Sequence, residues 1–268
     1  MEETGQQSPG AGNVDARRKG RVLYLTMTRP EVMNAMNGPL MEELEAALAK
    51  AGADRDVGVV VLDGAGGNFC SGADMRLLGE GLSAPDWVPV MQILGRVIRT
   101  IREIPQPVVS KVRGAAVGGG ANLALAADFV VAGHDARFCQ VFINLGVGLD
   151  AGGTYFLPRL VGLAKARELA LLGETISGEE AASIGLIYKS VPDDRLDREV
   201  DTLASKLAAK SLQASALIKS TLERSLSMSL AEVLDMETVH QAIMFQTTEH
   251  KEAVRSFFES RGKPKGSH

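Results

Sequence analysis

Two glycine-rich turns in this chain have the composition to hold a ligand through the main chain. The first, at residues 68–75, reads NFCSGADM and follows a short apolar run. The second, at residues 114–122, reads GAAVGGGAN and precedes a stretch of small residues that favours a helix. Three glycines that open a helix leave backbone N–H groups bare, with the positive end of the helix dipole behind them. Such a turn can hold an anion, although tight helix–strand packing also explains glycines.

The common phosphate and metal motifs do not match these turns or the rest of the chain. A P-loop requires Lys and then Ser or Thr after its glycines, and a dinucleotide site requires G-x-G-x-x-G with an acidic residue about 20 positions later. Neither pattern occurs here. The four histidines, His134, His240, His250 and His268, lack the paired spacing of metal ligands, so we expect no metal site. Cys70 and Cys139 lack the spacing of a zinc site and are too few for a disulfide framework, so we expect buried free thiols.

Strand-like apolar runs alternate with helical patterns through the first two thirds of the chain. Asn37 can cap a helix whose Leu40, Leu44 and Leu48 share one face. The run at 57–62, VGVVVL, is typical of a strand buried on both faces. This alternation predicts an α/β architecture with mostly parallel pairing, with strands at 22–28, 57–62, 107–112 and 129–132 and further helices at 87–102 and up to about 127.

From about residue 160 the pattern becomes helical. Ser177 and Glu180 have the spacing of a capping box, and amphipathic helices are predicted at 194–210, 212–226, 230–245 and 249–260. We interpret the chain as a disordered tail at 1–15, a core at 16–200, a helical region at 201–262 and a frayed tail at 263–268.

Charge and hydropathy limit the possible partners. The 268 residues carry 29 Lys+Arg against 33 Asp+Glu, a net charge of −4, which argues against nucleic-acid binding. The longest small-apolar stretch, 114–127, is shorter than the ~18 apolar residues of a membrane helix. The first 13 residues lack the basic start and apolar stretch of a secretory signal. We expect a cytoplasmic protein that binds neither nucleic acid nor membrane.

Six stretches carry patterns that recur together in one protein family. They lie at 29–36 (RPEVMNAM), 69–75, 108–128, 146–162 with AGGT at 151–154, 172–186, and 257–258 (FF). In this order they resemble the crotonase (enoyl-CoA hydratase/isomerase) superfamily over nearly the whole chain. The branch closest in appearance is that of the phenylacetate-pathway epoxyphenylacetyl-CoA isomerase, which the YFLPRLVG at 155–162 also resembles.

The resemblance implies a spiral of ββα units, a helical trimerisation region, and a homotrimer or a dimer of trimers. It implies that the backbone N–H groups of Ala73 and Gly119 bind the thioester oxygen of an acyl-CoA, with no cofactor beyond the coenzyme A that the substrate carries. Fixed donors favour the transition state, because the oxygen gains full charge only as the α-proton leaves. The residues expected at the substrate and CoA are Arg29, Ser71, Gly72, Ala73, Asp74, Met75, Gly118, Gly119, Asn122 and Phe142, with basic residues near Arg261 and Lys263 as further phosphate candidates.

An oxyanion site moves no proton, so a titratable partner is required. In hydratases similar to this chain, two glutamates occupy the positions of Asn122 and Phe142, and neither of these side chains can transfer a proton. In the isomerase branch, an aspartate before Gly-Gly-Thr is the acid/base, and here that aspartate is Asp150. We expect Asp150 to move a proton between two carbons, with a pKa raised by the apolar wall of Phe142 and nearby Phe138.

Other interpretations remain open at this point. Asp150 is alternatively a turn residue that caps the following helix. Hydratase activity is the second candidate, and a non-catalytic acyl-CoA binding homologue is the third, since both glutamates are missing. A dehalogenase of the same family needs a histidine to activate water, and none occurs between Met75 and Gly133. Asp74 and Asp128 are expected to hydrogen-bond at turns and helix ends.

Overall fold

The computed structural model describes residues 13–79 and 81–262, and the chain divides into two units, Met1–Ala209 and Lys210–His268. The division falls after Ala209 rather than after residue 200, because the helix at Leu196–Ala208 buries Leu196, Val200 and Ala204 against the sheet of the first unit. Of the two predicted tails, residues 1–12 and 263–268 lie outside the described residues. Val14 and Asp15 belong to the first strand.

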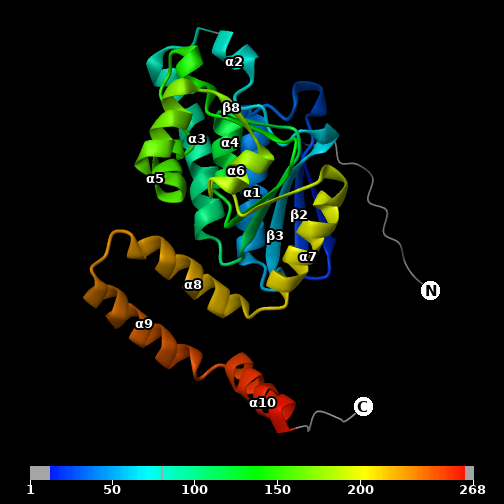
Figure 1. Cartoon of the computed structure of the whole chain (residues 1–268), viewed down its shortest axis with the longest axis vertical. Helices are drawn as coiled ribbons and strands as arrows, with labels where there is room; N and C mark the ends of the chain where they lie inside the picture. The colour runs from blue at the N-terminus through cyan, green and yellow to red at the C-terminus, as the bar shows by residue number, and fades with distance from the viewer. Residues whose placement is uncertain (1–12, 80, 263–268) are drawn as a thin grey trace, which may run out of the picture. The chain divides into compact units, whose positions relative to one another are not determined.

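A six-stranded sheet forms the centre of the first unit (Figure 1). All its neighbouring strands pair in parallel except the first two, which form an antiparallel hairpin. The prediction of an α/β architecture with mostly parallel pairing is therefore confirmed. In sheet order the strands are β1 (Val14–Lys19), β2 (Val22–Met27), β3 (Val59–Gly64), β4 (Val108–Val112), β6 (Phe129–Gly133) and β9 (Lys189–Val191).

A second, three-stranded sheet lies beside the glycine-rich turns. It contains β5 (Ala115–Val117), β7 (Arg137–Cys139) and β8 (Thr175–Ser177). The sequence did not indicate these strands, because three residues are too few to show a period-2 pattern. β5 ends directly before Gly118, so this sheet positions the triple glycine.

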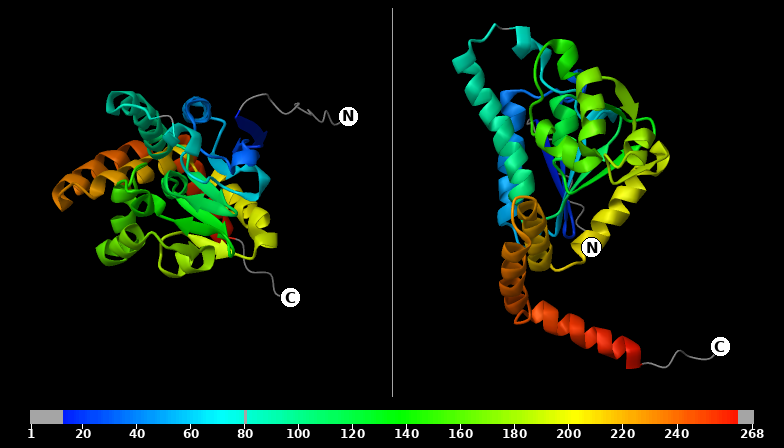
Figure 2. Two further views of the ribbon diagram at one scale, coloured as in Figure 1. Left: turned by 90° about the horizontal axis from the view of Figure 1, so that it is seen from above. Right: turned by 60° about the vertical axis from the view of Figure 1, so that its left-hand side comes forward.

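Helices cover both faces of the large sheet (Figures 1 and 2). Side chains alternate along β3: Val59 and Val61 join the cluster with α7 (Leu196–Ala208), whereas Val60 and Leu62 face the opposite cluster. That second cluster includes residues of α1 (Gly38–Ala53), α3 (Ala84–Glu103), α4 (Gly119–Leu125) and α5 (Gly153–Leu172). β3 is therefore buried on both faces, as its apolar run predicts.

Asn37 caps a helix as predicted, and of the capping box predicted at Ser177 and Glu180 the structure shows the Ser177 half. The Asn37 side chain accepts a hydrogen bond from Leu40 N at 3.0 Å at the start of α1, and Leu40, Leu44 and Leu48 are fully buried. Burying each of these leucines stabilises the fold by about 1.5–3 kcal/mol. The Ser177 hydroxyl caps α6 (Gly178–Ser183) by accepting from Glu180 N at 3.0 Å. The shorter elements are α2 (Met75–Gly79), η1 (Pro30–Val32), η2 (Ala65–Gly67), η3 (Val141–Leu145) and η4 (Asp193–Arg195).

The second unit consists of helices, as predicted. These are α8 (Leu212–Ser225), α9 (Leu230–Met244) and α10 (Thr248–Gly262). Several large apolar side chains on them are exposed within this chain, including Ile218, Leu222, Leu234, Ile243 and Phe257. No helix in the described part of the chain is both long and apolar enough to cross a membrane.

Candidate active site

The first glycine-rich turn lies directly against β5. Cys70 N donates to Ala115 O at 2.9 Å, and Val117 N donates to Cys70 O at 3.0 Å. The backbones approach so closely that a Cβ on Gly72 would lie 2.8 Å from Val117 O, and one on Gly120 would lie 2.3 Å from Cys70 O. Both positions therefore require glycine, and main-chain contacts fix the turn relative to α4.

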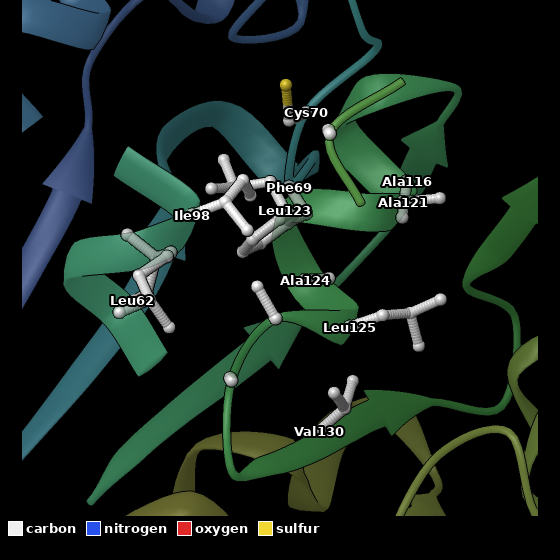
Figure 3. Packing of buried hydrophobic residues seen from close by; sticks show 14 of the residues in the cluster. Leu62, Phe69, Cys70, Ile98, Ala116, Ala121, Leu123, Ala124, Leu125 and Val130 are labelled. Carbon is white, nitrogen blue, oxygen red and sulfur yellow. The ribbon is translucent and has the colours of Figure 1, made fainter. Parts of the chain in front are cut away.

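Apolar packing also supports the junction between the first glycine-rich turn and α4. The side chains of Phe69 and Leu123 are fully buried, and Ile98 of α3 belongs to the same cluster. Figure 3 shows these three side chains gathered beside α4. Cys70 is a buried free thiol, as is Cys139, and burial raises the pKa of Cys70 to about 12. Both cysteines therefore behave as small apolar residues, as predicted.

Ala73 is held opposite Met36 by a pair of hydrogen bonds from its neighbours. Met36 N donates to Gly72 O at 2.7 Å, and Asp74 N donates to Met36 O at 2.9 Å. The N–H of Ala73 itself has no acceptor within the described residues, and Ala73 is exposed. Its donor is thus fixed in position and open to a ligand.

Gly119 supplies a second unused donor nearby. The preceding Gly118 N–H is occupied, since it donates to Cys139 O at 2.8 Å. Gly119 N, the first of α4, has no acceptor among residues 13–79 and 81–262. It lies 3.8 Å from the position that a Cβ on Gly72 would take. The two predicted donor segments therefore meet at one place.

Asp150 lies at the same place, in a turn before α5. One carboxylate oxygen, Oδ1, is 3.2 Å from the position of a Cβ on Gly119. This oxygen is buried and has no hydrogen-bond partner in the described structure. The carboxylate does not cap α5, whose N-cap is Gly152 without a side-chain hydrogen bond. The arrangement therefore favours a carboxyl that faces a ligand over a helix cap.

The environment of Asp150 changes its acidity in the predicted direction. Burial raises the pKa of its carboxyl from the ordinary value to about 6, since desolvation penalises the charged form. The end of the Met36 side chain lies beside Gly119 here, with Cε 2.6 Å from the position of a Cβ on that residue. Phe142 is buried and lies against Gly118, with its Cζ 3.7 Å from the position of a Cβ there.

Asn122, expected at the substrate, lies behind Asp150 instead. Its side chain is fully buried. Its Nδ2 donates to the Asp150 carbonyl oxygen at 2.9 Å, and its Oδ1 accepts from Gln140 Nε2 at 2.9 Å. Both ends of the amide therefore bind protein groups, and in this structure Asn122 supports the Asp150 turn.

Arg29, expected at a CoA phosphate, is likewise part of the internal support. It is 8% exposed, and it donates to the Ala35 carbonyl and to Asp74 Oδ2, the latter at 2.9 Å. Arg76 binds the same carboxylate from solvent. The hydrogen bonds from Arg76 and Arg29 hold the pKa of Asp74 well below its usual range, against the opposing effect of burial. Asp74 has the turn-stabilising role expected of it.

Removing Arg29 should destabilise the first unit. We expect Arg29→Ala to lower the free energy of unfolding by about 3 kcal/mol, because it breaks a buried ion pair and leaves the Asp74 carboxylate with Arg76 as its one remaining ion-pair partner. Arg76→Ala is the matched control, since Arg76 binds the same carboxylate but its side chain is 69% exposed. Urea denaturation measures the free energy of unfolding of both variants. Equal losses in the two variants would contradict the structural role of Arg29.

Two further predicted contact residues, Ser71 and Met75, flank Ala73 in the first glycine-rich turn. The Ser71 hydroxyl donates to Val32 O at 3.2 Å, which directs it towards η1. Met75 is 64% exposed at the start of α2, where it is available to an apolar part of a ligand. Asp128 Oδ2 accepts from Val108 N at 2.8 Å, the expected turn contact. Lys263 lies outside the described residues, and the side chain of Arg261 is not described.

Sequence reasoning missed three residues that build the site. Met36 lies beside Gly119, Gln140 supports Asn122, and Asn34 is fully buried. The Asn34 side chain accepts from Arg29 N and donates to Ala65 O and Asn68 O, which ties the segment after β2 to the first glycine-rich turn. A signal existed for Asn34 and Met36, because both lie in the motif at 29–36. Gln140 had none.

Comparison with known proteins decides the family. The family model described as enoyl-CoA hydratase/isomerase matches residues 17–265. The chain belongs to the enoyl-CoA hydratase/isomerase family. A protein of Rhodobacter capsulatus named probable enoyl-CoA hydratase is 41% identical over 241 residues, covering 88% of this chain and 91% of that protein.

Other members of the enoyl-CoA hydratase/isomerase family are similar over the same length. The 1,2-epoxyphenylacetyl-CoA isomerase of Escherichia coli is 35% identical over 243 residues, covering 90% of this chain and 93% of that protein. The crystal structure of an enoyl-CoA hydratase from Bacillus anthracis superposes with a TM-score of 0.89 at 30% identity, covering 92% of this chain and 96% of that one. The crotonase fold predicted from the sequence is therefore confirmed.

Proposed function

We propose that this member of the enoyl-CoA hydratase/isomerase family is an isomerase that moves a double bond, or isomerises a ring epoxide, in the acyl group of a coenzyme A thioester. One observation carries the proposal: a buried carboxylate oxygen without a partner in the described structure lies beside Gly119, whose unused N–H lies next to the turn that holds the unused N–H of Ala73. The 35% identity to an enzyme named 1,2-epoxyphenylacetyl-CoA isomerase supports the choice of isomerase.

In the proposed reaction the two backbone N–H groups bind the thioester oxygen while Asp150 transfers the proton. With a 3-enoyl-CoA, the Asp150 carboxylate removes a proton from C2, and the electron pair of that bond moves towards the carbonyl oxygen. The resulting negative charge is stabilised by the N–H groups of Ala73 and Gly119. Asp150 then returns the proton to C4, which leaves the double bond between C2 and C3. Atoms and charge balance without a metal, a redox cofactor or water.

Asp150 should determine the pH dependence of this reaction. We expect kcat/KM for double-bond migration to rise with pH, to reach half its maximum near pH 6 and to be constant above, because only the ionised carboxylate accepts a proton. The inflection lies near 6 because burial raises the pKa of Asp150 to about 6. Initial rates with a 3-enoyl-CoA between pH 4.5 and 8.5 measure it. An inflection near 4, or a rate that falls from pH 5 to 7, contradicts this assignment.

Hydratase activity is the second candidate, because the Rhodobacter capsulatus relative at 41% identity is named probable enoyl-CoA hydratase. Addition of water requires one group to activate the water and a proton returned to carbon. The two positions that carry glutamates in similar hydratases are Asn122 and Phe142 here. An assay with crotonyl-CoA distinguishes the candidates: rapid hydration favours the hydratase, whereas inertness towards crotonyl-CoA with migration in a 3-enoyl-CoA favours the isomerase.

The proposal includes the assembly of the chain. We propose a homotrimer or a dimer of trimers in which the helical unit mediates contacts, because the exposed apolar residues of that unit, such as Ile218, Leu222 and Phe257, are unfavourable in water. Sedimentation velocity measures the mass of the assembly.

A further inference from the structure

We infer that Asn122 and Gln140 are positioning residues that fix the Asp150 carboxylate relative to the Gly119 donor. The inference rests on the proposed function, in which these two groups act on the same acyl group. It assigns a role to two buried amides that touch neither the proposed donors nor the reacting carboxylate oxygen. Their effect on catalysis would act through Asp150.

Asn122 connects the two halves of the site through one side chain. It lies three residues after Gly119 on α4, and residues at this spacing lie on neighbouring turns of one helix face. Its Nδ2 donates to the main-chain carbonyl of Asp150 at 2.9 Å. The helix that presents the Gly119 N–H is thus tied directly to the turn that presents the carboxylate.

The turn that Asn122 holds has an uncommon backbone conformation. Ala151 has φ of +48°, in the left-handed region that a residue with a Cβ seldom adopts. The Asp150 carbonyl also accepts from Gly153 N at 2.9 Å, so two donors converge on it. A Cβ on Gly153 would lie 2.5 Å from Asn122 Nδ2, so glycine is required for the amide to reach the turn. Without the amide, the conformation of the turn loses one of the two bonds that hold it.

Gln140 fixes the direction of the Asn122 amide. Its Nε2 donates to Asn122 Oδ1 at 2.9 Å. Because that contact needs an acceptor, it orients Asn122 with Oδ1 towards Gln140 and with the donating Nδ2 towards Asp150. Gln140 is 5% exposed, and its own Oε1 has no partner within the described residues. The pair therefore acts in series, from the end of β7 through α4 to the Asp150 turn.

Such an arrangement matters for rate more than for binding. Proton transfer requires the carboxylate to be within hydrogen-bond reach of the reacting carbon, and a displacement of about 1 Å can lower the rate by ~10². Substrate binding depends on other groups, so the affinity for the CoA ester changes little. Opening the turn also admits water to Asp150, whose pKa is raised by burial alone.

The test compares Asn122→Ala with Asn144→Ala. Asn144 makes the same type of bond elsewhere, with Nδ2 donating to Gly173 O at 3.1 Å. We expect Asn122→Ala to lower kcat about 100-fold with KM within threefold, and to move the inflection of the kcat/KM profile from near pH 6 towards pH 4. Gln140→Leu should lower kcat and the pH of the inflection in the same direction, to a smaller extent. Asn144→Ala should change neither.

A purely structural role would lower the amount of folded enzyme and leave the pH profile of the remainder in place. An unchanged inflection in Asn122→Ala, whatever the loss of rate, therefore overturns the inference. A second readout does not depend on turnover: carbon-13 NMR titration of the Asp150 carboxyl, assigned with Asp150→Asn. If the wild type isomerises no acyl-CoA, the proposed function fails, but a lower titration midpoint in Asn122→Ala would still establish that Asn122 positions Asp150.

Discussion

Asp150→Asn is expected to lower double-bond migration by at least ~10²-fold while the affinity for a CoA ester stays within a few-fold, because a general acid–base group contributes about 10²–10⁴ to the rate. Asparagine has the same shape but cannot accept the proton. Rates are measured with a 3-enoyl-CoA and a ring-epoxide acyl-CoA, and affinity by calorimetry with a saturated acyl-CoA. Isomerisation at the wild-type rate in this variant would refute the assignment of Asp150.

Thermal stability provides a control for the folding of the Asp150→Asn variant. Because burial raises the pKa of Asp150, the ionised form destabilises the folded state as pH rises through about 6. Asp150→Asn should therefore melt no lower than the wild type at pH 8. Asp135→Asn, at an exposed turn position, controls for the loss of an aspartate elsewhere and should keep full activity.

Gly119→Pro should remove the second donor while leaving α4 intact. Gly119 is the first residue of the helix, where proline is favoured and its missing N–H breaks no helical bond. The loss of one donor to a developing oxyanion lowers kcat by about 10²–10³, or about 2.7–4 kcal/mol. Steady-state kinetics with a 3-enoyl-CoA measure this loss, and circular dichroism verifies the fold.

Gly119→Ala is the matched control for this experiment. Both variants add a Cβ that meets Met36 Cε and lies close to Asp150 Oδ1, so they share that steric disturbance, and the proline ring in addition replaces the N–H hydrogen with Cδ. Only the alanine variant keeps the N–H. The additional loss in the proline variant therefore reports the replacement of the N–H by Cδ, and equal activity of the two variants would show that Gly119 donates no hydrogen bond in the transition state.

The elements that were predicted from sequence are those with strong local signals. Asn37 caps α1 because its side chain reaches Leu40 N three residues later, and the apolar run of β3 is buried on both faces. The strands of the small sheet lacked such a signal. β7 pairs with β5 over a separation of about 20 residues, and its three residues show no periodicity.

The same distinction applies to the site. Ala73, Gly119 and Asp150 lie in recognisable motifs, and the structure brings their segments together. The placement of Arg29 and Asn122 could not be predicted, because burial depends on partners that are distant in sequence. Arg29 binds Asp74, 45 residues away, and Asn122 binds Gln140 and Asp150, 18 and 28 residues away. No local pattern indicates such contacts.

The close backbone approach at Gly72 and Gly120 makes the position of the main-chain donors independent of the side chain that transfers the proton in the proposed reaction. The groups that we propose to polarise a carbonyl belong to the main chain, and the contacts that fix them would survive exchange of most surrounding side chains. The proposed proton-transferring group is a single side chain on a separate turn. Laboratory evolution that retains these two glycines and varies residues 142 and 150 therefore explores new reactions on an unchanged activating scaffold.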